Sequence, residues 1–110
     1  MAFGGVRLSE FVVTSGAIAT FASSDIAERG FCAQCGTPLT YRGVGSDRVS
    51  VTLGSLDDPG AAEPQTQLGV ESKVRWLDRS LSLPELRIEQ WLAKKKIAAV
   101  HSHEHPDPQI

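Results

Sequence analysis

The chain has 110 residues, with 11 lysines and arginines against 13 aspartates and glutamates, and so a net charge of −2. Proteins that bind nucleic acids concentrate basic charge, so this balance argues against a nucleic-acid partner. No apolar run is long enough to cross a membrane, and the first residues carry no export signal. We therefore expect one cytoplasmic domain over residues 1–110, with reduced thiols and no membrane partner.

Short apolar runs near the N-terminus predict the first strands. Residues 11–13 and 17–21 are partly β-branched and flank a Thr-Ser-Gly turn, which predicts a hairpin with Gly16 at positive φ. A Ser-Ser-Asp sequence then ends the pattern. Asp25 is placed to cap one helical turn, which we expect to end at Gly30.

Alternation of apolar and polar residues gives the clearest hairpin of the sequence. It occupies residues 39–42 and 48–53, with a glycine-containing turn at 43–47. A period of two is the mark of half-buried strands. A weaker alternation over 66–70 predicts one more strand, after an Asp-Pro-Gly turn at 56–60.

The apolar period changes to about 3.6 residues near the C-terminus. Ser82 and Glu85 fit a capping box, and the lysines at 94–96 stand where the helix dipole favours cations. The pattern predicts one helix over about 83–96, followed by a flexible tail over 101–110. The expected fold class is therefore mostly β with one C-terminal α-helix.

Several large or charged side chains have both a structural and a functional interpretation. We expect Trp76 to cap the core and Trp91 to anchor the helix on the sheet, because the chain has few other aromatic residues. Arg42, Lys73 and Arg75 could bind carboxylates of a ligand, although surface charges on strands and loops need no function.

The two cysteines of the chain, Cys32 and Cys35, are separated by two residues. Two thiolates at this spacing can grip one metal ion, and Gly36 permits the positive φ that closes such a turn. A thioredoxin-like redox pair is the alternative, but its cysteines begin a helix, whereas the sequence from Pro38 predicts a strand. We favour a metal site and keep two cysteines without a ligand as a further alternative.

Structural zinc almost always takes four ligands, so the two cysteines form only half of a site. Within the chain, His101, His103 and His105 are the candidates for the remaining ligands. They lie in a proline-flanked terminus, where histidines are usually solvated. Otherwise the missing pair comes from a partner chain or is absent.

Three stretches of the sequence resemble one known family. They are 28–41 (ERGFCAQCGTPLTY), 49–59 (VSVTLGSLDDP) and 71–77 (ESKVRWL). From about residue 11 to 77 the chain resembles the glutathione-dependent formaldehyde-activating enzymes and centromere-protein-V-like domains. The resemblance implies an Mss4-like fold of small coiled sheets, bound zinc, and carbon–sulfur lyase activity on glutathione–aldehyde adducts.

The resemblance also implies a role for the cysteine pair. In the family, the pair that matches Cys32 and Cys35 completes a four-cysteine structural zinc site with an N-terminal C-x-C segment, and a separate C-x-C-x-x-C segment holds the catalytic zinc. Neither segment occurs here, where the chain begins at Met1. We therefore expect a chain whose start was assigned too far downstream, or a truncated relative, inactive by itself and with unassigned catalytic residues. The alternative is a non-catalytic small β zinc-knuckle module or a degenerate remnant.

Overall fold

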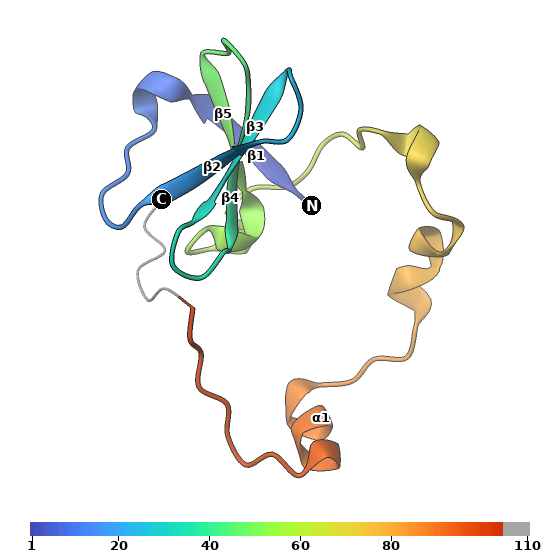
Figure 1. The fold of residues 1–110 in the computed structure, drawn as a ribbon. Helices are drawn as coiled ribbons and strands as arrows, with labels where there is room; N and C mark the ends of the chain where they lie inside the picture. The colour runs from blue at the N-terminus through green and yellow to red at the C-terminus, as the bar shows by residue number, and fades with distance from the viewer. Residues whose placement is uncertain (105–110) are drawn as a thin grey trace. The chain divides into compact units, whose positions relative to one another are not determined.

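A computed structural model describes residues 1–104 of the chain. Backbone contacts divide the described residues into two units, residues 1–65 with 103–104, and residues 66–102. The first unit holds all the strands of the described residues, and the second holds the α-helix (Figure 1).

The five strands of the first unit form one antiparallel sheet, in the order β1-β5-β4-β3-β2. Their bounds are β1 Phe3–Arg7, β2 Ile18–Ala22, β3 Ala27–Cys32, β4 Pro38–Gly43 and β5 Arg48–Thr52. The second unit adds a single α-helix, α1 (Ile88–Lys95). The expected fold class, mostly β with one C-terminal helix, is therefore confirmed.

The hairpin that the sequence predicted most clearly is confirmed as β4 and β5. In its register, Thr40 lies opposite Val51 and Tyr41 lies opposite Ser50. The alternation that predicted these strands also fixes which side chains are buried, because a strand points successive residues to opposite faces. The buried apolar residues of the described chain are Ala27, Leu39, Val49 and Leu53.

The predicted hairpin of residues 11–13 with 17–21 is wrong. Gly16 does have a positive φ of 74°, but β2 pairs with β3, so that Ile18 lies opposite Cys32. Residues 27–32, where we expected the end of a helical turn, are β3, which pairs with β2 on one side and β4 on the other. The backbone hydrogen bonds that β3 forms with β2 and β4 stabilise the strand more than capping by Asp25 would stabilise a single helical turn.

Strand β1 was not predicted from the sequence. It pairs along its whole length with β5, from Phe3 opposite Thr52 to Arg7 opposite Arg48. Two consecutive glycines, Gly4 and Gly5, hide the alternation that would have indicated a strand.

The predicted strand at 66–70 is also wrong. Residues 66–69 belong to no helix or strand among residues 1–104, and Val70 begins a 3₁₀ turn, η4 (Val70–Ser72). Gly69 precedes it with φ 76°, a left-handed conformation that interrupts any strand. A longer 3₁₀ segment follows, η5 (Arg75–Ser82).

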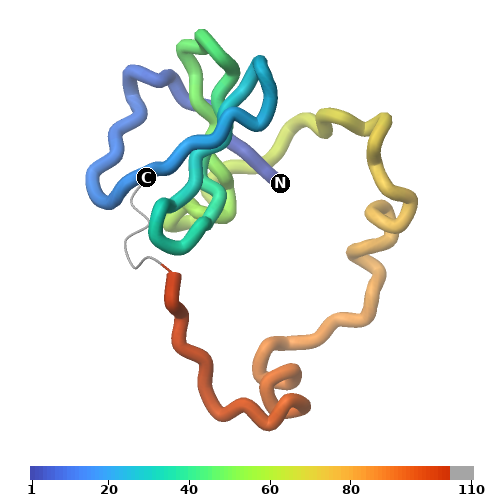
Figure 2. The backbone as a smooth tube through the Cα atoms, viewed as in Figure 1, coloured from blue at the N-terminus to red at the C-terminus, as the bar shows by residue number. Residues whose placement is uncertain are grey.

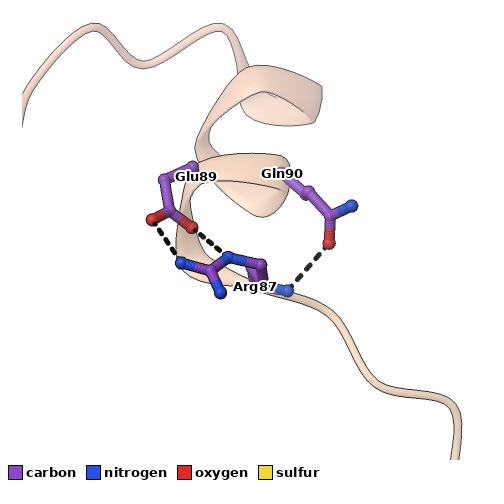
Figure 3. A network of polar contacts seen from close by, with 3 residues as sticks. All are labelled: Arg87, Glu89 and Gln90. Carbon is purple, nitrogen blue, oxygen red and sulfur yellow. Dashed lines mark hydrogen bonds and ion pairs between the residues drawn. The ribbon is translucent and has the colours of Figure 1, made fainter.

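Helix α1 is shorter than the predicted 83–96 and begins at a different cap. The Ser82 hydroxyl donates to the carbonyl of Arg79 at 2.8 Å, so it ends η5 and does not cap α1. The helix begins after Arg87, whose backbone N–H donates to Oε1 of Gln90 at 2.9 Å (Figure 3). It ends at Lys95, and Lys96, which caps it, has a left-handed φ of 58°.

The two tryptophans do not lie in a core, contrary to our expectation. Trp76 is 63% exposed and Trp91 43% exposed. Within 66–102 no residue is buried. Residues 101–104 form no helix or strand, and the rest of the predicted tail lies outside the described residues. None of the helices in residues 1–104 has the length and apolar character that a membrane crossing requires.

Candidate metal centre

The two cysteines lie on one tight turn between β3 and β4. Cys32 is the last residue of β3, and Cys35 falls within the turn. Figure 2 shows the path of the backbone through the first unit. The Cys32 carbonyl accepts from the Gly36 N–H at 2.9 Å, and the Cys32 N–H donates to the Thr37 carbonyl at 2.9 Å. Gly36 has φ 79°, where a residue with a Cβ is strained. The turn therefore has the closed backbone and the glycine that the spacing predicted.

The context of the turn differs from that of a thioredoxin-like pair. Pro38 begins β4 directly after the turn, as predicted, and no helix of the described residues begins at the cysteines. A helix N-terminus is what lowers the pKa of the first thiol in redox pairs of that kind. This arrangement favours metal binding over redox exchange.

Both thiols are half-buried, and they are not joined by a disulfide. Sγ of Cys35 lies 3.1 Å from the hydroxyl oxygen of Thr37. A thiolate has no proton to give, so in the ionised state Thr37 is the donor. Such a bond offsets part of the negative charge that a metal-binding thiolate carries.

Both cysteines line a cavity of about 590 Å³ in the first unit. The wall beside them is the loop at 15–17, and the Ala33 N–H ties the cysteine turn to that loop by donating to the Ala17 carbonyl at 3.2 Å. A second wall is formed by residues 54–57 at the end of β5. The turn that carries the two cysteines thus borders a space large enough for a metal ion with further ligands or for a small organic molecule.

The hydroxyls of Thr52 and Ser55 form hydrogen bonds beside the cysteine turn (residues 32–37). Thr52 is 5% exposed, and its hydroxyl donates to the Pro38 carbonyl at 3.0 Å. The Ser55 hydroxyl lies beside it and donates to the Thr52 carbonyl at 2.9 Å. These bonds fasten the end of β5 to the first residue of β4. The sequence analysis missed both residues, although a threonine and a serine three positions apart often form such local bonds.

Polar side chains singled out from the sequence have other roles in the structure. Arg42 donates to the carbonyl of Ser46 through Nε at 3.1 Å and Nη2 at 2.9 Å, which holds the turn between β4 and β5. Asp58 accepts from the N–H of Gly60 at 3.0 Å, the role expected of a turn residue. Asp57 lines the cavity, which the sequence did not indicate.

The structure brings together the two cysteines of the predicted metal site. Within residues 1–104, no three or more His, Cys, Asp or Glu side chains are grouped closely enough to hold a metal ion. His101 and His103 are exposed, and His105 lies outside the described residues. A role for these histidines as ligands stays a prediction.

Comparison with known proteins gives one match. The family model described as glutathione-dependent formaldehyde-activating enzyme matches residues 1–72. The matched region contains all five strands, both cysteines and the walls of the cavity at 15–17 and 54–57. No curated protein and no solved structure matches the chain.

Proposed function

Because the chain belongs to the family of glutathione-dependent formaldehyde-activating enzymes, we propose that it binds zinc through Cys32 and Cys35. The observation that carries this proposal is the cysteine turn, which holds two thiols at one cavity and is closed by two backbone hydrogen bonds. Thiolates are soft ligands that suit zinc, and two of them satisfy half of a tetrahedral structural site. A zinc ion bound through four such ligands supplies folding free energy.

The chain's own residues prepare the two thiols for this role. The Thr37 hydroxyl lies within hydrogen-bond distance of Cys35 Sγ and is the donor once that thiol is ionised, and Gly36 allows the turn to close without strain. Thr52 holds the carbonyl of Pro38, so the strand that follows the turn has a fixed position. Because these contacts already order the turn, metal binding has little chain entropy to overcome.

We propose further that the family's substrate chemistry, on glutathione–aldehyde adducts, does not proceed on this chain by itself. In that chemistry the glutathione sulfur adds to the aldehyde carbon, and the carbonyl oxygen takes up the proton that the thiol loses. Cleavage of the same carbon–sulfur bond is the reverse step. The chain has two cysteines in all, and once Cys32 and Cys35 serve as structural ligands no thiol is left to hold a catalytic metal.

A metal titration tests the zinc proposal. Zinc affinity is measured on the full chain by competition with a coloured chelator, for the wild type and for Cys32→Ser and Cys35→Ser. Each serine variant is expected to lose at least about tenfold in affinity, because a hydroxyl is a poor ligand for zinc. Ala33→Ser, an exposed change between the two cysteines, is the matched control and is expected to bind as the wild type does. Equal affinity in all four proteins would overturn the proposal.

An activity assay tests the second part. The rate of adduct formation between formaldehyde and glutathione is followed by NMR, with and without the zinc-loaded chain. We expect the two rates to be equal. An acceleration that Cys32→Ser abolishes would show that the chain is catalytic and that the cysteine pair does more than stabilise the fold.

A non-catalytic binding module is the second candidate. It is favoured by the segment 66–102, in which apolar side chains such as Leu68 (98% exposed) and Leu81 (96% exposed) face solvent. Exposed apolar surface of this kind often contacts a partner. Acceleration in the activity assay would exclude this candidate.

A further inference from the structure

A second, smaller cavity lies in the strand-bearing unit and is not used by the proposed metal site. It has a volume of about 210 Å³, and the residues that line it include Phe3, Phe31 and Arg29. This volume equals that of about seven molecules of liquid water, which is room for a small organic ion. No acidic residue is among its described lining residues.

The guanidinium of Arg29 lies over the ring of one aromatic residue, Tyr41. Its central carbon lies 5.1 Å from the centre of the Tyr41 ring, and the Tyr41 ring in turn packs against Phe3, with ring centres 6.1 Å apart at 52°. Contact with an aromatic face restricts the position of a guanidinium, but it does not use the N–H donors, which lie in the plane of the guanidinium itself. Arg29 is therefore oriented by contacts that do not consume its hydrogen-bonding capacity.

The positive charge of Arg29 has no anionic partner in the part of the chain that the structure describes. The ion pairs among residues 1–104 are Lys73 with Asp78 and Arg87 with Glu89. Arg29 is an exposed residue that lines the cavity. An arginine is well suited to planar anions, which accept two parallel hydrogen bonds from the guanidinium fork. Arg29 is the one cationic side chain among the described lining residues, which also include Met1, and a single guanidinium fork matches a single carboxylate.

We propose that Arg29, Phe3 and Phe31 form a binding subsite for a small monocarboxylate with a short apolar chain. The carboxylate pairs with the guanidinium of Arg29, and the apolar chain lies against the two phenylalanine rings. The subsite goes beyond the metal site and does not depend on it, because none of its three residues is a proposed zinc ligand. It shares Met1, Pro38 and Thr52 with the larger cavity, so the two sites border one another.

An NMR titration of the full chain with sodium butyrate tests the subsite. Butyrate is added at constant ionic strength to the isotope-labelled protein, and butyramide, which has nearly the same shape and no charge, is added in a parallel series. We expect butyrate to shift the amide signals of Phe3, Arg29 and Phe31 in a saturable manner, with an affinity in the millimolar range. Butyramide is expected to bind at least about tenfold more weakly, since it cannot form the charge-assisted pair.

Substitutions at Arg29, with one control at Arg7, test whether butyrate binds through the Arg29 guanidinium. Arg29→Gln is expected to lower butyrate affinity at least about tenfold, whereas Arg7→Gln, an exposed change on β1, is expected to leave it unchanged. Should Arg29→Gln lose its dispersed spectrum, Arg29→Lys keeps the charge and is expected to bind butyrate more weakly than the wild type, because it lacks the planar fork.

Three results would overturn the proposal. They are equal affinity for butyrate and butyramide, undiminished butyrate affinity in Arg29→Gln or in Arg29→Lys, and displacement of butyrate by inorganic phosphate at lower concentration. None of these depends on zinc, so failure of the subsite and failure of the metal site are distinguishable.

Discussion

The strand-bearing unit and residues 66–102 contain similar apolar side chains, but several of these side chains are buried in the first region and none is buried in the second. In the first, Leu39 is 5% exposed and Val49 4% exposed, whereas in the second Leu68 and Leu81 are almost fully exposed. Both regions have the spacing of apolar residues that predicts regular structure. The difference teaches that spacing leads to burial only where paired backbones supply a surface on which side chains can pack.

The backbone hydrogen bonds of the two regions explain this difference in burial. Strands in the first unit bond to one another along the sheet, so each apolar face is shared by several strands. In 66–102 the backbone bonds are local, as in the Ser72 N–H to the Gly69 carbonyl at 3.0 Å and the Leu77 N–H to the Val74 carbonyl at 3.2 Å. Local bonds shape a turn but bring no distant side chains together.

The largest expected effect tests this comparison directly, with one leucine from each region. Leu39→Ala is expected to lower the free energy of unfolding by about 3 kcal/mol, because it leaves a cavity in the core. Leu81→Ala, the same change at a 96% exposed position, is expected to alter it by less than about 0.5 kcal/mol. Urea unfolding of both variants measures the difference. A comparable loss in Leu81→Ala would break the comparison, since it would mean that Leu81 is buried in solution.

The next effect sharpens the comparison within the sheet. A Cβ at Gly30 would lie 2.1 Å from the hydroxyl oxygen of Thr40 and 2.9 Å from Cγ2 of Ile18. Gly30→Ala is therefore expected to cost about 2 kcal/mol, less than a full clash because the Thr40 hydroxyl can rotate away. Gly54→Ala is the control, because a Cβ there meets no atom within 4 Å.

Urea unfolding of these two glycine variants gives the outcome. A stability loss in Gly30→Ala that the double variant Gly30→Ala/Thr40→Ala partly restores would confirm the close packing of β3 on β4. Equal stability of Gly30→Ala and Gly54→Ala would contradict it.

The sequence predicted the parts of the fold that depend on neighbouring residues. The alternation at 39–42 and 48–53 indicated β4 and β5 because the two strands are joined by a short turn and pair with each other. It did not predict β1, since that strand pairs with β5 more than forty residues away. Nor could it place the cap of α1, because the competing hydrogen bond of Ser82 belongs to the preceding 3₁₀ segment.

For the candidate site too, the sequence predicted the local turn but not the contacts between strands. The spacing of Cys32 and Cys35 and the glycine after them indicated the turn, and the structure has that turn. The bracing by Thr52 could not be foreseen, because its partner Pro38 lies on another strand and the sequence shows only a polar residue at an alternating position. Contacts between strands depend on register, which spacing within one strand does not determine.

A smaller effect is expected where the sheet meets the cysteine turn. Thr52→Val keeps the shape of the side chain but removes its hydrogen bond to the Pro38 carbonyl, which is expected to cost about 1 kcal/mol in unfolding free energy and to lower zinc affinity. Thr20→Val, at an exposed position on β2, is the matched control. Urea unfolding and chelator competition measure the two effects. Unchanged zinc affinity in Thr52→Val would show that the hydroxyl stabilises the sheet without positioning the turn.

The smallest expected effect on stability comes from an ion pair in residues 66–102, at the start of α1. The guanidinium of Arg87 donates to both carboxylate oxygens of Glu89, at 3.2 Å and 3.1 Å, and this bond lowers the pKa of Glu89 below its ordinary value (Figure 3). Since the folded pKa is the lower one, the bond stabilises the helix start above the ordinary glutamate pKa of about 4.3 and is lost as the pH falls through the lowered value.

A carboxyl NMR titration measures this pKa in the wild type and in two variants. Arg87→Gln is expected to raise the Glu89 midpoint toward the ordinary glutamate range, because it removes the larger of the two hydrogen-bonding causes, the other being the Glu89 backbone N–H. Arg79→Gln, outside the helix, is expected to leave the midpoint low. Because the pair is exposed, with side chains 78% and 71% accessible, its effect on stability is expected to be small and reduced by salt. Amide signals of β3 and β4 should not change over the same acidic range as Glu89 is protonated. If they followed the Glu89 titration, residues 66–102 would be coupled to the sheet, and the contrast between the two regions would no longer hold.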